Sequence, residues 1–289
     1  MKLCLQCGSP FTVEGWSCPD CGFTPVRSGN CMVLLADNQP APAGYDVSFF
    51  PEIAKLEDHS FWFRSRTRLI VWAMRKYFPG ARTFLEVGCG TGCVLAGMAA
   101  AFPDLALHAS EPFSEGLWFA QQRVPGATFL QLDARNIPFR DEFDVIGAFD
   151  VLEHIDDDLY VLAQMHRAVA PGGGVLLTVP QHEFLWSRQD DEAGHVRRYK
   201  AADLRDKLTR TGFRIRRMTS FVSSLLPAML LSRVFKGRQG AEFDALDELR
   251  IGAVLNGTMG AAMALERALI RAGVSFPAGG SLLVAAEKS

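Results

Sequence analysis

The sequence predicts an α/β fold in which a mostly parallel sheet is covered by helices on both faces, preceded by a small metal-binding module. Three observations predict it. Apolar runs alternate with helical patterns after residue 82, a glycine-rich turn follows the first of these runs, and two Cys-x2-Cys pairs lie near the N-terminus. Alternation of apolar strands with helices is typical of parallel sheets that are buried on both faces.

Composition indicates a folded chain without a membrane span. Of the 289 residues, 48% are apolar and 21% are charged, and the net charge is −2. This is ample apolar material for a core, and a disordered chain is therefore excluded. The longest uncharged apolar stretch, 221–232, is too short to cross a bilayer. The N-terminus lacks the pattern of a secretory leader, so we expect a cytoplasmic protein.

Residues 1–26 are predicted to form a zinc ribbon. Two Cys-x2-Cys pairs can bring four thiolates to one tetrahedral Zn²⁺, the ligands being Cys4, Cys7, Cys18 and Cys21. A glycine follows the second cysteine of each pair, where a tight turn needs positive φ. Four thiolates leave no open position for chemistry, so the site is expected to be structural. Disulfides, which a cytosolic setting disfavours, and free thiols are the alternatives.

Within the module, two short strands are expected to contain Phe11, Val13 and Trp16.

The segment between the module and the main domain has no regular pattern. Residues 27–58 are interrupted by prolines and glycines, and we predict a linker laid over the surface. The main domain is expected to occupy 59–289.

Strands and helices of the main domain follow in order. The expected strands are 83–87, 105–109, 128–132, 143–149 and 174–179, and the helices between them are 93–102, 114–123 and 157–170. A further helix is expected at 201–211, with strands at 213–219 and 281–287. Residues 220–280, rich in Leu, Ala and Met, predict helices inserted before the last strand.

The turn after the first strand has the pattern of a cofactor-binding loop. Its glycines, Gly88, Gly90 and Gly92, let the backbone turn sharply and approach a ligand closely. Glu86, at the end of the strand, would repel a phosphate but suits a cationic ligand. A related turn occurs in dinucleotide enzymes, and this alternative is disfavoured because no phosphate-binding group is present.

Acids also end the following strands. Glu111 can take both hydroxyls of a ribose, Asp133 can accept from an adenine amino group, and Asp150 lies just beyond the fourth strand. Ligands of such sheets bind at the carboxyl ends of the strands. A ring of acids there suits a ribose, an adenine and an ammonium group better than a pyrophosphate.

These motifs resemble those of class I S-adenosylmethionine-dependent methyltransferases, particularly the group that includes the ubiquinone-biosynthesis O-methyltransferases. The segments that carry the resemblance are Leu85-Glu-Val-Gly-Cys-Gly-Thr-Gly92, Glu111-Pro, Asp133-Ala, Asp150-Val-Leu-Glu-His-Ile155 and Pro171-Gly-Gly173. The resemblance implies a Rossmann-like, seven-stranded sheet with an antiparallel last strand. It also implies that the glycines line the methionine moiety, and it adds to the cofactor contacts Cys89, Pro112, Ala134 and Leu152.

Two histidines are candidates for the base that takes the acceptor's proton. His154 follows the fourth strand and is expected to point towards the transferred methyl group. His195 is the second candidate, in a segment after the fifth strand. The alternatives are local roles, in which each histidine only orients a turn.

That segment also predicts a substrate loop, because loops at this edge of the sheet carry function. The candidate substrate-binding residues are His182, Trp186, Arg197, Arg198 and Tyr199. The alternative is that the arginines face solvent. With the aromatic segment 59–66, these residues also resemble bacterial methyltransferases associated with surface glycans and lipid-linked sugars. In that subgroup the segment covers the cofactor, with Arg64 or Arg66 available to its carboxylate.

A basic run predicts contact with an anionic membrane surface. Nine Lys or Arg lie between residues 197 and 217, and an apolar stretch follows, flanked by Arg233, Lys236 and Arg238. A solvated helix followed by a core or lid helix is the alternative.

The resulting functional prediction is methyl transfer from S-adenosylmethionine to a small molecule, at an oxygen of a sugar, glycolipid or related metabolite. One alternative is a ribosomal RNA methyltransferase with a zinc module, but the module has a single basic residue, Lys2, and a nucleic-acid partner is not expected. Another is a non-catalytic protein that uses the module for docking. The sequence does not indicate an oligomeric state.

Overall fold

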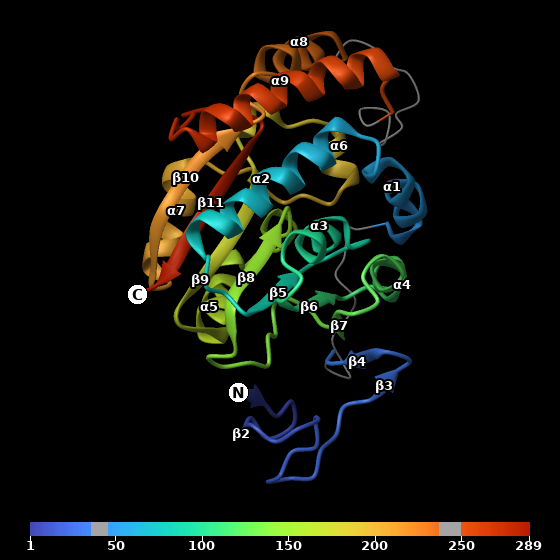
Figure 1. The fold of residues 1–289 in the computed structure, drawn as a ribbon, viewed down its shortest axis with the longest axis vertical. Coiled ribbons are helices and arrows are strands. Elements are labelled where there is room, and N and C mark those ends of the chain that lie inside the picture. The colour runs from blue at the N-terminus through green and yellow to red at the C-terminus, as the bar shows by residue number, and fades with distance from the viewer. Residues whose placement is uncertain (36–45, 237–249) are drawn as a thin grey trace.

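The computed structural model describes residues 1–35, 46–236 and 250–289 (Figure 1). Within these residues nine strands form one sheet, in the order β10-β11-β9-β8-β5-β6-β7-β4-β3. The seven strands of the main domain are β5 (Thr83–Val87), β6 (Ala106–Glu111), β7 (Thr128–Gln131), β8 (Phe143–Phe149), β9 (Val169–Pro180), β10 (Phe213–Phe221) and β11 (Ser281–Lys288).

The strand directions confirm the predicted architecture. Strands β7, β6, β5, β8 and β9 run parallel to one another, while β11 lies antiparallel to both β9 and β10. Every predicted strand of the main domain is present, although β9 begins five residues earlier than expected, at Val169. The last strand in the sequence, β11, therefore lies between β9 and β10. The insertion that precedes β11 is thus held to the sheet at both of its ends.

Helices cover both faces of the sheet. Successive side chains along a strand point to opposite faces, and their contacts show which helices cover which face. Phe84 of β5 packs with α2 (Phe61–Tyr77), α3 (Cys93–Ala101) and α9 (Ala253–Arg271). The next residue, Leu85, points to the opposite face and packs with α5 (Asp158–Ala168) and α7 (Ala201–Arg210). Helix α4 (Ser114–Arg123) packs beside α3 on the first face.

The segment 27–58 differs from the predicted linker. It contains β3 (Arg27–Ser28), β4 (Cys31–Val33), the 3₁₀ turn η1 (Val47–Phe49) and α1 (Phe50–Glu57). Strand β4 adds to the edge of the sheet, parallel to β7. The short apolar run of β4 satisfies backbone groups that the β7 edge would otherwise leave unpaired. The prolines and glycines around it concealed this strand.

The N-terminal module packs against the end of the sheet at which the parallel strands begin. Its two strands are β1 (Lys2–Leu3) and β2 (Pro10–Phe11), so the expectation that Val13 and Trp16 form strands is wrong. Trp16 instead packs edge-on against Phe139, with ring centroids 5.6 Å apart. Because Phe139 lies just before β8, the module sits opposite the carboxyl ends of the strands.

In the described part of the insertion before β11 there are two helices, α8 (Leu226–Lys236) and α9. Arg238 lies outside the described residues, and the side chains of Arg233 and Lys236 are not described. None of the helices in the described ranges combines the length and the hydropathy that crossing a bilayer requires.

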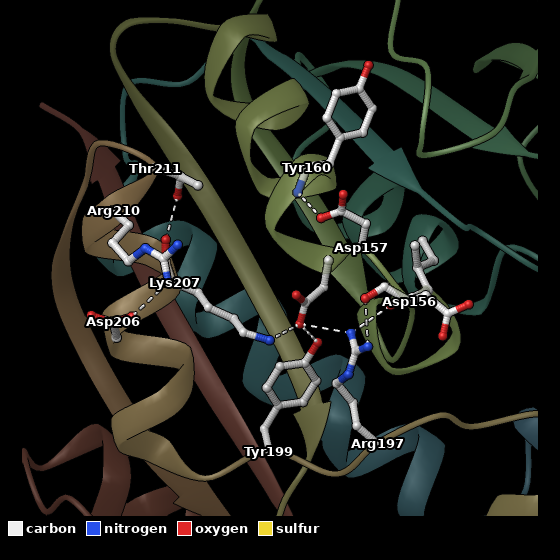
Figure 2. Close-up of polar contacts among 11 residues, drawn as sticks. Asp156, Asp157, Tyr160, Arg197, Tyr199, Asp206, Lys207, Arg210 and Thr211 are labelled. Carbon is white, nitrogen blue, oxygen red and sulfur yellow. Dashed lines mark hydrogen bonds and ion pairs between the residues drawn. The ribbon is translucent and has the colours of Figure 1, made fainter.

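A buried carboxylate, that of Asp158, ties the segment after residue 194 to helices α5 and α7. Its Oδ2 accepts hydrogen bonds from the Tyr199 hydroxyl at 2.6 Å and from Lys207 Nζ at 2.5 Å, and it lies 3.0 Å from Nη1 of Arg197. Figure 2 shows Arg197, Tyr199 and Lys207 converging on one carboxylate. Arg197 also donates to two carbonyl oxygens before α5. This network fixes the path of residues 195–199.

We predict that Tyr199→Phe lowers the free energy of unfolding by about 1–3 kcal/mol, because a buried charged acceptor loses one hydrogen bond. Urea denaturation measures this. The matched control is Tyr160→Phe on α5, where the ring is half exposed and the change should stay within about 0.5 kcal/mol. Equal effects of the two substitutions would contradict the role assigned to Tyr199.

Candidate functional site

The glycine-rich turn lies between β5 and α3, at the carboxyl end of the central strand. Gly88, Gly90 and Gly92 all have positive φ, between 51° and 81°. A Cβ on Gly88 would lie 2.5 Å from Val151, and one on Gly92 would lie 2.9 Å from the backbone of Ala120. Gly90 has nothing closer than 3.9 Å. Gly88 and Gly92 thus permit close packing, while Gly90 leaves space beside the turn.

A cluster of buried charges lies at the end of β5 and β8. Arg66 of α2 forms an ion pair with Asp150 and stacks on Trp62, 4.4 Å from its ring centroid. Glu86 is 2% exposed, and its Oε2 has no hydrogen-bond partner among the described residues. Burial raises the pKa of Glu86 to about 8, and the charge of Arg66 partly opposes this rise. Arg66 Nε is likewise buried without a partner in the described chain.

The acids that end β6 and follow β7 already have protein partners. Glu111 accepts hydrogen bonds from the backbone N–H of Gly90 at 3.0 Å and of Phe113 at 3.3 Å. Burial raises the pKa of Glu111 to about 7, although these two bonds oppose the rise. Asp133 accepts from Arg135 through both of its oxygens. The sequence did not indicate this pairing, because Arg135 has no distinguishing pattern.

Helix α1 covers the glycine turn. Phe50 lies 3.9 Å from the position of a Cβ on Gly90. At the other end of the helix, buried Glu57 accepts hydrogen bonds from Thr91 of the turn and from Arg123 of α4. Because the sequence predicted a linker over residues 27–58, it did not indicate helix α1 or these contacts.

A cavity of about 540 Å³ opens beside the charged cluster, a size within the range of small-molecule sites. Its walls are mostly apolar and come from α2, α8, α9 and the end of β10; they include Phe61, Trp62, Val222, Leu225, Met229 and Met259. One end is polar and holds Asp150, Glu153, Asp190, His195 and Arg198. An apolar chamber with polar groups at one end suits a ligand with an apolar body.

A histidine–carboxylate pair stands at the polar end of the cavity. His195 Nδ1 lies 2.9 Å from Oδ1 of Asp190, which is 1% exposed. Arg198 donates to both oxygens of Asp190, at 2.8 and 3.0 Å, and Ser187 donates from its backbone. Asp190 is thereby held ionised, and its pKa lies below the usual range because these bonds outweigh burial. With Nδ1 engaged, Nε2 of His195 is left to act as an acceptor.

His154, the first candidate base, lies behind His195. The two rings meet edge to face, with centroids 4.7 Å apart. Burial and the neighbouring His195 lower the pKa of His154 to about 4. Among the described residues that line the cavity, His195 is present and His154 is not. The geometry therefore places His195, rather than His154, against the cavity.

Glu153 and Asp190 are the functional residues that sequence reasoning missed. Glu153 is fully buried, and neither of its oxygens has a hydrogen-bond partner in the described chain. Burial and the charge of Asp150 raise the pKa of Glu153 well above its ordinary value. Ligand atoms of Glu153, His154 and His195 lie within 4.8 Å of one another, close enough to share a cation. The one available signal was the five-residue spacing of Asp190, which lies in the short helix α6 (Arg188–Glu192), and His195, which follows that helix.

The remaining predicted substrate residues divide between the cavity and the scaffold. Arg198 reaches the cavity through Asp190, whereas the polar atoms of Arg197 and Tyr199 belong to the Asp158 network. Trp186 donates to Asp191 at 2.9 Å, and His182 stacks on its neighbour Phe184. Of the two arginines offered to the cofactor, Arg66 is buried in the site. Arg64 is exposed.

The four cysteines of the module gather at one point. The Sγ atoms of Cys4 and Cys21 are 3.6 Å apart and those of Cys7 and Cys18 are 3.7 Å apart, and all four lie within 4.8 Å of one another. Four ligands at a Zn–S distance of about 2.3 Å, placed tetrahedrally, have sulfur–sulfur separations of about 3.8 Å. Gly8 and Gly22 adopt φ of 75°, as the knuckle turns require. The thiols are thus arranged to suit a tetrahedral metal ion.

Comparison with known families decides the class of protein. Residues 55–217, more than half of the chain, match the family model described as a methyltransferase domain. The chain belongs to this methyltransferase family. Its fold and motifs make it a class I S-adenosylmethionine-dependent methyltransferase, as the sequence predicted.

Relatives in other organisms agree with this assignment. The chain is 25% identical over 169 residues to a probable S-adenosylmethionine-dependent methyltransferase of Mycolicibacterium smegmatis, covering 56% of this chain and 63% of the relative. It is 27% identical over 143 residues to the ubiquinone biosynthesis O-methyltransferase of Pseudomonas paraeruginosa, covering 44% and 61%. A methyltransferase of Schizosaccharomyces pombe is 29% identical over 114 residues, covering 35% and 41%. The chain therefore spans between 41% and 63% of the length of these relatives.

Solved structures share the fold. Phosphoethanolamine N-methyltransferase 2 of Haemonchus contortus, solved with S-adenosyl-L-methionine, has a TM-score of 0.51 at 19% identity and covers 76% of this chain and 52% of its own. The [4+2]-cyclase SpnF has a TM-score of 0.57 at 17% identity, covering 84% and 93%. At such identities the likeness shows the fold alone, and one fold hosts several reactions.

We predict that Glu86→Gln reduces the loss of stability at alkaline pH. The pKa of Glu86 is raised to about 8 in the folded protein and is about 4.3 in the unfolded chain. Folding therefore binds a proton, and this contribution to stability is full below about pH 4.3 and is lost as the pH rises through 8. Urea unfolding at about pH 5.5 and 8.5 should show a smaller decrease in the variant, by about 1–3 kcal/mol. Exposed Glu14→Gln is the control, and an unchanged decrease in Glu86→Gln would contradict the prediction.

Proposed function

We propose that this protein transfers a methyl group from S-adenosylmethionine to a hydroxyl oxygen of a small amphipathic acceptor, a glycolipid or a related metabolite. The observation that carries the proposal is the His195–Asp190 pair at the polar end of a mostly apolar cavity. A free sugar would leave many hydroxyls against apolar walls without partners, which is costly. An acceptor with an apolar body and one reactive hydroxyl matches both ends of the cavity.

The residues around the glycine turn fit the cofactor. The space beside Gly90 allows close approach, and the unpartnered atoms of Glu86 and Arg66 can meet an ammonium and a carboxylate group. We assign Glu111 to the ribose hydroxyls. Its carboxylate would accept hydrogen bonds from them in place of the one it now accepts from the N–H of Gly90. The cofactor supplies an electrophilic methyl group on a sulfonium centre.

The chain's own residues provide alignment and a proton acceptor. Nε2 of His195 takes the proton from the acceptor hydroxyl, so that the oxygen becomes nucleophilic. Asp190 holds the Nδ1–H and stabilises the imidazolium that results, while Arg198 keeps Asp190 ionised and fixed. The apolar walls exclude water from the reacting oxygen.

We predict that His195→Ala lowers kcat by about 10²–10⁴-fold while leaving the affinity for S-adenosylmethionine unchanged. Labelled cofactor and fractionated cell extract measure both the rate and the fraction that receives the methyl group, which should be the lipid-extractable one. Exposed His59→Ala is the matched control. A higher pH should partly restore the kcat of the His195→Ala variant, since an acceptor that is already ionised needs no base. Near-normal kcat in His195→Ala would remove the histidine base from the reaction, and label in the RNA fraction would favour the RNA alternative.

We also propose that Cys4, Cys7, Cys18 and Cys21 bind one structural Zn²⁺. Support comes from the sulfur–sulfur separations and from the two glycine-terminated knuckles. Within the described residues no part of the module lines the cavity, so the metal would stabilise the fold and take no part in the chemistry.

The zinc prediction is one metal ion per chain in protein purified without chelator, measured by elemental analysis. Cys18→Ser should lose the metal and lower the melting temperature, because zinc binding stabilises small modules of this kind. Cys93→Ser, outside the module, should retain it. Affinity for S-adenosylmethionine should be the same in both variants. Metal-free wild-type protein would refute the assignment.

A further inference from the structure

The helices that cover the acceptor cavity present an apolar surface outwards. Half of the large apolar side chains that are exposed in the described residues lie on α8, on α9 or directly after α9: Leu230, Leu231, Val254, Leu255, Leu265, Leu269 and Val274. Val254 is 84% exposed and Leu265 is 65% exposed. The outward side of a surface helix is normally polar. We call these seven residues the α8–α9 face. Exposed apolar side chains gathered on neighbouring elements in this way are typical of an interaction site.

Basic side chains also lie on α9 and on the neighbouring helix α2, and no exposed acid on these two helices balances them. The two helices contain seven Lys or Arg and one acid, Glu266, which is buried and bonded to the backbone of Ser224. Arg68, Arg267 and Arg271 have no ion-pair partner in the described chain, and Nη1 of Arg267 is buried without a partner. Burial and the charges of Arg68 and Arg271 lower the pKa of Arg267. Three cations are thus gathered where an anion would stabilise them.

Six of the nine cations in the basic run at 197–217, which was expected to contact a membrane, form ion pairs with described residues. Arg197 and Lys207 pair with Asp158, and Arg198 pairs with Asp190. Further along the run, the pairs are Arg210 with Asp206, and Arg214 and Arg216 with Glu287.

The α8–α9 face adjoins the acceptor cavity. Leu255 belongs to both, since it is 49% exposed and lines the cavity, and Met229 of α8 and Met259 of α9 line the same space. Figure 1 shows α8 and α9 at the end of the molecule opposite β2 and β3. An apolar molecule that enters the cavity past Leu255 would therefore pass from the apolar outer surface of α8 and α9 to the apolar walls of the cavity.

We propose that the α8–α9 face docks on an anionic phospholipid bilayer, with Arg68, Arg267 and Arg271 contacting the headgroups. Amphipathic helices bind bilayers through this combination of exposed apolar side chains and flanking basic residues. A second copy of the chain is the competing occupant. Charge complementarity disfavours it, because two copies meeting through this face would bring like charges together. Docking would place the cavity mouth at the depth of lipid acyl chains.

Co-sedimentation of the full-length protein with vesicles tests the proposal. Phosphatidylcholine vesicles containing about 30% phosphatidylglycerol should bind the protein, and high salt or pure phosphatidylcholine should weaken binding. The double variant Val254→Asp/Leu265→Asp should bind at least about tenfold less. Trp118→Asp, on the exposed side of α4, is the matched control and should bind as wild type.

Arginine variants test the charge contribution. Arg68→Gln and Arg271→Gln should each weaken binding about fivefold, whereas Arg210→Gln on α7 should not. Failure to bind anionic vesicles would overturn the proposal, as would equal binding to uncharged ones. A dimer in solution that Leu265→Asp dissociates would instead assign the face to a second copy. Vesicle binding is measured without an acceptor, so its failure would leave the proposed methyl transfer standing.

Discussion

One buried guanidinium balances the acids at the centre of the site. Arg66 pairs with Asp150, and its charge also opposes the rise in pKa that burial imposes on Glu57, Glu86 and Glu153. Carboxylates removed from water are unstable without such a partner. Helix α2 carries Arg66, and Trp62 one turn earlier stacks on it while lining the cavity. The position of α2 therefore couples the cofactor turn to the acceptor space.

The second element of the site depends on a different scaffold. His195 is placed by Asp190, and Asp190 is held by Arg198, while the neighbouring Arg197 and Tyr199 anchor the same segment to Asp158. Adjacent residues in the sequence thus serve in alternation as site and as anchor. A side chain on an irregular segment keeps its geometry only when such contacts hold the segment in place. Arg197 and Tyr199 therefore position His195 without lining the cavity themselves.

Three features of the molecule lie at different distances from the start of the parallel strands. The four-cysteine module adjoins the residues before β8, the glycine turn follows the carboxyl end of β5, and helices α8 and α9 lie at the end of the molecule opposite β2 and β3 (Figure 1). A parallel sheet imposes this order, because the carboxyl ends of its strands all lie at the same end of the sheet.

The sequence by itself determined the parts whose physics is local. The strand–turn–helix around Gly88, Gly90 and Gly92, the acids that end the strands and the paired cysteines are each encoded within a few residues by backbone freedom, periodicity or ligand spacing. The edge strand β4 escaped detection, because three residues pair with β7 only after the chain returns across nearly a hundred positions.

Only the tertiary structure decided which of the candidate side chains meet. Arg64 and Arg66 are equivalent in sequence, but two positions on a helix differ by about 200°, so one faces the site and the other faces solvent. The sequence favoured His154 over His195 as the candidate base, but the packing puts the ring of His154 behind that of His195, and only His195 lines the cavity among the described residues. Burial of Glu153 and the ion pairs of Arg214 and Arg216 with Glu287 likewise depend on partners distant in sequence. Desolvation and ion pairing are properties of the assembled interior, and composition alone does not specify them.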